Sequence, residues 1–151
     1  MPKISICCPV YTMEDNRSEK FLVEYFSNLY FQTFKDFEIV ISDQSTLDNL
    51  KSIVDTFSNI LNIQYVKNTN EKKNAANNVN HAVRYAKGDI VKLLYMDDFF
   101  VDPFALQKIS DAFDNNTESK WFISGFTHCN EARSEYFNTK TPWYGNTYVN
   151  G

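Results

Sequence analysis

Glycine is scarce in this chain: four glycines occur among 151 residues, at positions 88, 125, 145 and 151. None belongs to a dinucleotide fingerprint or a Walker phosphate loop, both of which need closely spaced glycines where the backbone approaches phosphate. Nicotinamide chemistry and P-loop hydrolysis are therefore not expected. Any phosphate group would have to be held by a metal ion and by side chains.

Positive charge and long apolar runs are also lacking. The formal net charge is −4 and the isoelectric point is near 5.1, which leaves no broad basic surface for nucleic acid. No run of about eighteen apolar residues occurs, and the N-terminus does not look like an export signal. We expect no membrane span, no nucleic-acid partner and a cytoplasmic location.

Metal-binding sulfur and imidazole ligands are few. The chain has three cysteines, Cys7, Cys8 and Cys129, and two histidines, His81 and His128. None of them has the spacing of a zinc site. We expect the cysteines to be reduced core residues and the histidines to have surface or packing roles.

The apolar residues, 43% of the chain, are enough for one domain and follow an alternating pattern. Short β-rich runs predict strands, and apolar residues at helical spacing predict helices. The predicted strands are 4–10, 37–42, 63–66, 89–94 and 121–124, and the predicted helices are 17–34, 47–58, 72–86 and 103–115. This order favours a Rossmann-like α/β fold with a mostly parallel sheet flanked by helices. We expect a single domain over 1–151, with its core in 1–128 and an irregular tail in 129–151.

Three predicted strands end in residues suited to ligand binding. The first strand ends in Pro9-Val10 with Tyr11 next, the second is followed by Asp43-Gln44-Ser45, and Met96-Asp97-Asp98 come shortly after the fourth. In open α/β sheets, ligands bind beyond the carboxyl ends of the strands. We therefore expect these three segments to converge on one pocket.

The adjacent carboxylates of Asp97 and Asp98 suggest a metal ion. Neighbouring acids repel each other unless a cation compensates their charge. Oxygen ligands suit Mg²⁺ or Mn²⁺, which proteins hold with one or two carboxylates plus substrate phosphates. The alternative is a solvated turn in which Asp98 caps the next helix.

A second polar group stands near the start of the third predicted helix. It consists of Lys72, Lys73, Asn77, Asn78 and Asn80. Donors at a helix start can bind phosphate, but an ordinary solvated helix face explains the same residues equally well.

In series, these motifs resemble the nucleotide-binding part of family 2 glycosyltransferases with the GT-A fold, over about residues 3 to 126. Ile4 to Tyr11 resembles the opening strand with its Pro-x-Tyr end, and Asp43 to Thr46 resembles the Asp-Asp-x-Ser loop. The passage from Gln32 to Ile39, the stretch from Asn78 to Asn80 and the turn from Ala86 to Ile90 also match the family pattern.

The resemblance implies a donor site for a nucleoside diphosphate sugar, with a uridine nucleotide expected. Asp43 would hydrogen-bond the pyrimidine, Pro9 and Tyr11 would flank the base, and Lys73 would lie nearby. Asp97 would meet the ribose or the metal shell, and Asp98 would bind Mn²⁺ or Mg²⁺ directly. The full expected nucleotide-sugar site is Pro9, Val10, Tyr11, Asp43, Ser45, Lys73, Asn78, Met96 and Asp97.

Two departures from the family pattern stand out. The acidic motif of the family often reads Asp-x-Asp-Asp, whereas this chain has Tyr95 in the first place. In inverting members the carboxylate that activates the acceptor hydroxyl follows a segment resembling Asn150-Gly151. We therefore expect a minimal or truncated enzyme whose acceptor side is incomplete and whose catalytic base is unknown.

Other readings of the tail and of the whole chain stay open. Glu131, Glu135 and Asp102 are the acids to consider as a base, although each is also an ordinary surface carboxylate. Trp143 and Tyr144 could stack on an acceptor sugar or anchor the tail. The acceptor itself could be a glycan, a lipid or a protein. Alternatives to an enzyme are a nucleotide-sugar-binding module serving a partner chain and, more remotely, a flavodoxin-like or receiver-like signalling domain.

Overall fold

The computed structural model describes residues 1–13 and 15–137 of the chain. The chain divides into two compact units, Met1–Asn115 and Asn116–Gly151. Within the described residues, no helix has the length and apolar character needed to cross a membrane.

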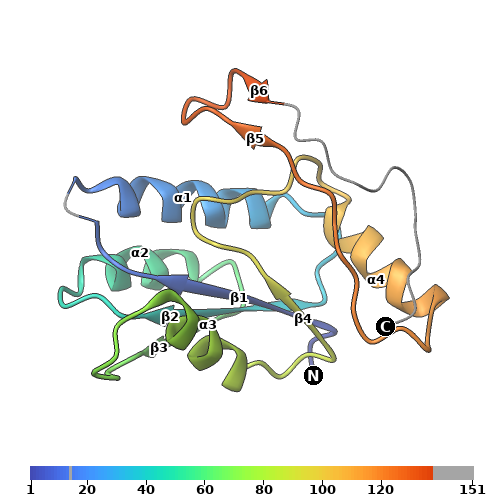
Figure 1. Cartoon of the computed structure of the whole chain (residues 1–151), viewed down its shortest axis with the longest axis horizontal. Helices are drawn as coiled ribbons and strands as arrows, with labels where there is room; N and C mark the ends of the chain where they lie inside the picture. The colour runs from blue at the N-terminus through green and yellow to red at the C-terminus, as the bar shows by residue number, and fades with distance from the viewer. Residues whose placement is uncertain (14, 138–151) are drawn as a thin grey trace. The chain divides into compact units, whose positions relative to one another are not determined.

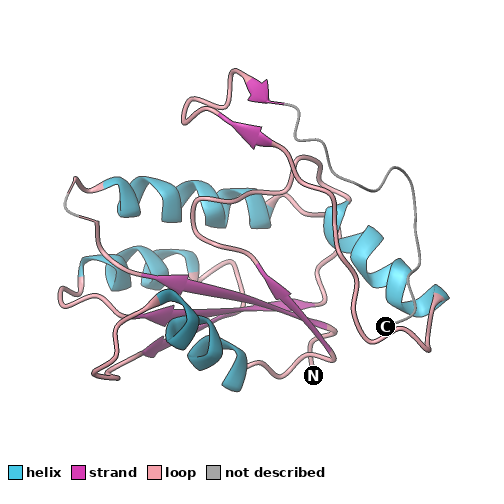
Figure 2. Cartoon of the chain, in the orientation of Figure 1, coloured by secondary structure: helices cyan, strands magenta, loops and turns pink. Residues whose placement is uncertain are grey.

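The first unit contains a four-stranded sheet in which every neighbouring pair is parallel (Figures 1 and 2). Its strands are β1 (Ile4–Val10), β2 (Phe37–Asp43), β3 (Ile63–Lys67) and β4 (Ile90–Leu93), in the order β3-β2-β1-β4. The two central strands, β1 and β2, are buried along their whole length, which explains why their sequences are almost continuously apolar. The predicted parallel α/β sheet is confirmed.

Four helices accompany the sheet: α1 (Arg17–Tyr30), α2 (Asn49–Phe57), α3 (Ala75–Arg84) and α4 (Ala105–Asn115). Figure 1 shows α1 and α2 on one face of the sheet and α3 on the other. The larger core lies on the α1 side, where Tyr25 and Phe26 of α1 are fully buried. A smaller cluster on the α3 side contains Cys7, Val40 and Ala82.

The first helix is shorter than predicted, and Gln32, two residues beyond its end, bonds to another part of the chain. The prediction placed its end at Phe34, but α1 ends at Tyr30. The Gln32 side chain is buried, donates to the Asp102 carbonyl at 3.0 Å and accepts from the Leu106 amide at 3.1 Å. These bonds use a glutamine to join the end of α1 to the start of α4, which a periodicity argument cannot foresee.

At the amino end of the sheet, Gly88 fits against β1 in a space too small for a side chain. Its amide donates to Ser5 Oγ at 2.7 Å, and Ser5 Oγ in turn donates to the buried Glu38 at 2.6 Å. A Cβ at position 88 would lie 2.7 Å from the Ser5 nitrogen and 2.9 Å from the Ile4 carbonyl carbon. Both are backbone atoms, which cannot move aside as a flexible side chain would.

Replacing Gly88 by alanine is therefore expected to destabilise the protein by about 1–3 kcal/mol, because the added methyl group overpacks β1. Urea unfolding at equilibrium measures the change. Gly125→Ala is the matched control, since a Cβ there meets nothing within 4 Å. Equal stability of the two variants would show that the close approach at Gly88 is absent in solution.

Two of the three cysteines behave as predicted, and one does not. Cys7 and Cys8 are free and fully buried in β1, and burial raises the pKa of the Cys7 thiol to about 11. Burial also raises the pKa of Cys8 far above its ordinary value. Cys129 is free but only partly buried, in the second unit, so its prediction as a core residue is wrong.

The second unit holds a short antiparallel hairpin of β5 (His128–Cys129) and β6 (Tyr136–Phe137). Neither strand was predicted, and all of the hairpin after His128 falls in the tail that was expected to be irregular. Asn130 shapes its turn by accepting from the Ser134 amide at 2.9 Å. The strand predicted at 121–124 is wrong: this stretch has no strand structure, and Trp121 and Ile123 are exposed. β-rich residues form a strand only when another strand pairs with them.

Candidate functional site

The carboxyl ends of the strands meet at one edge of the sheet. Val10 pairs with Asp43, and Asp43 pairs with Lys67, so the last residues of β1, β2 and β3 form one row. The pairing of β4 with β1 ends at Leu93, and Asp97 follows four residues later along the chain. The segments predicted to bind a ligand therefore all leave the sheet at this edge.

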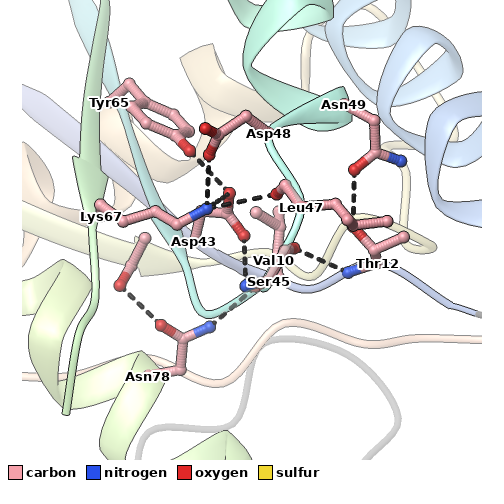
Figure 3. Close-up of polar contacts among 11 residues, drawn as sticks. Val10, Thr12, Asp43, Ser45, Leu47, Asp48, Asn49, Tyr65, Lys67 and Asn78 are labelled. Carbon is pink, nitrogen blue, oxygen red and sulfur yellow. Dashed lines mark hydrogen bonds and ion pairs between the residues drawn. The ribbon is translucent and has the colours of Figure 1, made fainter.

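Asp43 is the centre of a hydrogen-bonded cluster at this edge (Figure 3). Its side chain is completely buried. Oδ1 accepts from the Ser45 amide at 2.7 Å, and Oδ2 accepts from the Tyr65 hydroxyl at 2.6 Å and from Lys67 Nζ at 3.2 Å. Three donors and one positive charge compensate the desolvation of this carboxylate.

The contact with Asp43 shifts the pKa of both of its partners on β3, Tyr65 and Lys67. Burial and the hydrogen bond to Asp43 raise the pKa of the Tyr65 hydroxyl well above its ordinary value. Burial lowers the pKa of Lys67, but hydrogen bonds to Asp48 and Asp43 outweigh burial and raise it overall. Both groups therefore stay protonated near neutral pH, and both act as donors.

The loop after β2 is tied to the loop after β1. Ser45 Oγ accepts from the Thr12 amide at 2.8 Å, and Thr12 Oγ1 donates to Asn49 Oδ1 at 2.9 Å (Figure 3). Gln44, the residue before Ser45, is 8% exposed, and its Nε2 is buried with no hydrogen-bond partner in the protein. A buried donor without a protein partner is uncommon.

Asn78 joins α3 to the ends of β1 and β2. Its side chain is 3% exposed, and Nδ2 donates to the Val10 carbonyl at 3.1 Å. Oδ1 accepts from Ser42 Oγ at 2.6 Å and from Asn68 Nδ2 at 3.1 Å. All these partners are protein groups, so in this structure Asn78 holds the edge of the sheet together.

The acidic pair after β4 lies in a tight turn, with the Asp98 amide donating to the Tyr95 carbonyl at 3.0 Å. Asp97 and Asp98 are both exposed, whereas Met96 before them is buried. Among the described residues, no cluster of three or more His, Cys, Asp or Glu side chains could hold a metal by itself. Two accessible carboxylates nonetheless suit an ion that takes its remaining ligands from phosphates and water.

Lys72 and Lys73 lie in the turn before α3, where both are exposed. Asn74 caps this helix by accepting from the Asn77 amide at 2.9 Å. The helix start is thus already capped, and the two lysines bring positive charge to the loop that follows β3.

The profile of the family described as Glycosyl transferase family 2 matches residues 5–148. The chain belongs to this family. The match covers the sheet, the acidic turn and the second unit, and it confirms the resemblance carried by the serial motifs.

The relatives and solved structures that this family 2 chain matches agree with the family assignment. It is 33% identical over 99 residues to the GalNAc(5)-diNAcBac-PP-undecaprenol beta-1,3-glucosyltransferase of Campylobacter jejuni, covering 65% of this chain and 30% of that protein. It matches Staphylococcus aureus TarS 1-349 in complex with UDP-GlcNAc with a TM-score of 0.65 and 27% identity, over 76% of this chain and 32% of that one. A mannosyltransferase of Pyrobaculum calidifontis, with GDP-Man and Mn²⁺, shares the fold at a TM-score of 0.64 and 22% identity, over 77% of this chain and 33% of that one. The family 2 chain thus spans about a third of the length of these proteins.

The residues predicted for the nucleotide-sugar and metal sites of this family 2 chain fall into two groups. Tyr11, Lys73, Asp97 and Asp98 are exposed at the carboxyl edge or in the loops that leave it, whereas Pro9, Val10, Asp43, Ser45, Asn78 and Met96 are buried. Their ligand roles remain predictions. Tyr65 and Lys67 were not predicted as site residues, although their alternate positions on β3 place them on the same face as Asp43.

The candidate bases have different surroundings. Asp102 accepts from the Phe104 amide at 2.7 Å and from Lys108 at 2.8 Å, and these contacts lower the pKa of its carboxyl group. A lowered pKa makes Asp102 a weaker proton acceptor. Glu131 and Glu135 are exposed in the second unit, while Trp143 and Tyr144 lie outside the described residues.

The histidines match their expected roles in packing and at the surface. His81 lies 2.8 Å from Ser42 Oγ through Nδ1, and its ring packs against Tyr85. Burial, with a smaller effect of Arg84, lowers the pKa of His81. His128 is exposed on β5 and packs edge-on against Phe126.

Proposed function

We propose that this chain is the donor-binding portion of a glycosyltransferase that uses a UDP-sugar together with Mn²⁺ or Mg²⁺. The observation that carries the proposal is the exposed Asp97-Asp98 turn at the carboxyl edge of a family 2 sheet. Transfer to an acceptor with inversion at the anomeric carbon follows from the family resemblance alone.

The choice of uridine is supported by a relative. The matched TarS structure contains UDP-GlcNAc, and its identity to this chain is 27%. The unpartnered Nε2 of Gln44 adds an argument from this chain itself, since a base carbonyl would supply the acceptor it lacks. Asp43 remains predicted to contact the pyrimidine, but both of its oxygens already accept hydrogen bonds. We therefore propose that Gln44 shares this contact.

The residues present fit a divalent cation. Asp97 and Asp98 would hold it with their exposed carboxylates, and the donor diphosphate would complete its coordination. When bound, such an ion stabilises the negative charge that develops on the departing diphosphate. Lys73, and Lys72 beside it, would add positive charge near the phosphates.

Calorimetric titration with UDP tests the donor site. We expect measurable heat in the presence of MnCl₂ at protein concentrations of about 100 μM, at which weak ligands still register. ADP serves as the control nucleotide, because its diphosphate is the same and its base is different. Absence of heat with UDP, with or without the ion, would refute the proposal.

The alternative function is a binding module that serves a partner catalytic chain. It is favoured by the state of Asp102, whose carboxylate is engaged by Lys108 and the Phe104 amide. Incubation with UDP-GlcNAc separates the two functions. Metal-dependent release of UDP indicates an enzyme, whereas binding without release indicates the module.

A further inference from the structure

The ammonium group of Lys67 donates three hydrogen bonds to the loop after β2 and to the last residue of that strand. Its Nζ donates to Asp43 Oδ2 at 3.2 Å, to Asp48 Oδ1 at 2.9 Å and to the Leu47 carbonyl at 3.2 Å. Its side chain is 32% exposed, whereas that of Asp43 is fully buried and that of Asp48 is 80% exposed. One ammonium group thus joins the end of β2, inside the protein, to the far end of the loop that follows it (Figure 3).

Asp48 is committed to this contact instead of its usual local role. It occupies the N-cap position of α2, where aspartate ordinarily accepts a hydrogen bond from the first turn of the helix. No such side-chain bond is present here. The Asp48 carboxylate accepts from Lys67 instead. The hydrogen bond that would have capped α2 is therefore replaced by one that connects the loop to β3.

The loop fastened in this way, residues 44–48, follows β2 directly at the carboxyl edge of the sheet, where the donor is expected to bind. Ser45 in this loop accepts from the Thr12 amide, and Gln44 in it has the unpartnered buried amide. If Lys67 were apolar, Asp43 would lose its cation and Asp48 its partner. The loop would keep the bond from the Gln44 amide to the Val10 carbonyl at 3.1 Å and the contacts of Ser45 with Thr12 and Asp43, all of which lie at its start.

We propose that Lys67 is a positioning residue: it locks loop 44–48 in the conformation that receives the nucleobase and does not itself bind phosphate. This inference rests on the proposed function for the identity of the ligand. The lock itself is a property of the free protein and can be tested without any nucleotide.

Hydrogen exchange tests the lock. In Lys67→Met we expect the Ser45 and Thr12 amides to exchange at least about tenfold faster, because the loop opens locally while the sheet stays folded. The Ile39 amide within β2 should keep its protection. Asp48→Asn, which leaves the buried pair of Asp43 and Lys67 intact, should give a smaller increase, and Lys67→Arg should restore protection. Unchanged exchange in both Lys67→Met and Asp48→Asn would overturn the lock.

Ligand binding tests what the lock is for. In Lys67→Met we expect the Kd for UDP with Mn²⁺ to rise by about tenfold, which corresponds to about 1.4 kcal/mol. The Kd for pyrophosphate with Mn²⁺, which has no base, should not change. Lys35→Met removes the same charge at the other end of the sheet and should leave both constants unchanged.

The outcomes separate the two proposals. Weaker binding of pyrophosphate as well as UDP would show that Lys67 is a phosphate ligand, and unchanged UDP binding would show a purely structural residue; either result would overturn the positioning role. If the wild-type protein binds no UDP while Lys67→Met still accelerates exchange at Ser45 and Thr12, the proposed function fails and the lock remains.

Discussion

Replacing Asp97 and Asp98 together by asparagine is expected to abolish the effect of Mn²⁺ on UDP binding. Both carboxylates are exposed at the edge where the strands end, and asparagine keeps their size while removing the charge that holds a hard cation. Any metal-dependent turnover of a UDP-sugar should fall by at least about 100-fold, since the charge on the departing diphosphate would be uncompensated. Calorimetry with and without MnCl₂ and an assay for released UDP measure the two effects.

The stability of this double variant provides an independent check. Both side chains are exposed, so without metal the asparagine variant should change the free energy of unfolding by no more than about 1 kcal/mol. Asp89→Asn is the matched control, because Asp89 is exposed just before the other end of β4. If UDP binding by the double variant still depended on Mn²⁺, the acidic turn would not be the metal-binding site. A marked loss of stability would show that the two aspartates have a structural role.

The sequence predicted the sheet well because β1 and β2 are buried on both faces and are therefore apolar throughout. It also predicted that the candidate site segments leave the sheet together, because the carboxyl ends of parallel strands must share one edge. It failed for 121–124, where β-rich residues without a partner strand stay irregular. Pairing is a property of two segments, and a single run of residues does not reveal it.

Within the site, the sequence identified residue types but not their partners. Asp43 was singled out as a residue that meets the ligand directly, but its environment depends on Tyr65 and Lys67, which are more than twenty residues away along the chain. Their contribution follows only from the register of β2 with β3. The local sequence around a lysine at a strand end does not reveal whether its side chain pairs with a buried carboxylate or extends into solvent.

The second large effect is expected from Asn78→Leu. The leucine cannot replace the hydrogen bonds to Ser42, Asn68 and the Val10 carbonyl, and the polar groups it leaves behind are buried. Each buried polar group that loses its partner costs about 1–3 kcal/mol, so we expect the free energy of unfolding to fall by about 3 kcal/mol. Urea unfolding at equilibrium measures it.

Asn80→Leu is the control for this substitution, because Asn80 is on the same helix but exposed. Its effect should lie within about 0.5 kcal/mol. The comparison also decides between the two roles open to Asn78. A ligand-binding side chain would lower UDP affinity and leave stability nearly unchanged, whereas a side chain that joins α3 to β1 and β2 must lower stability even when no nucleotide is present. The three protein partners of Asn78 favour the second result, in which any loss of UDP affinity would follow from movement of the strand ends.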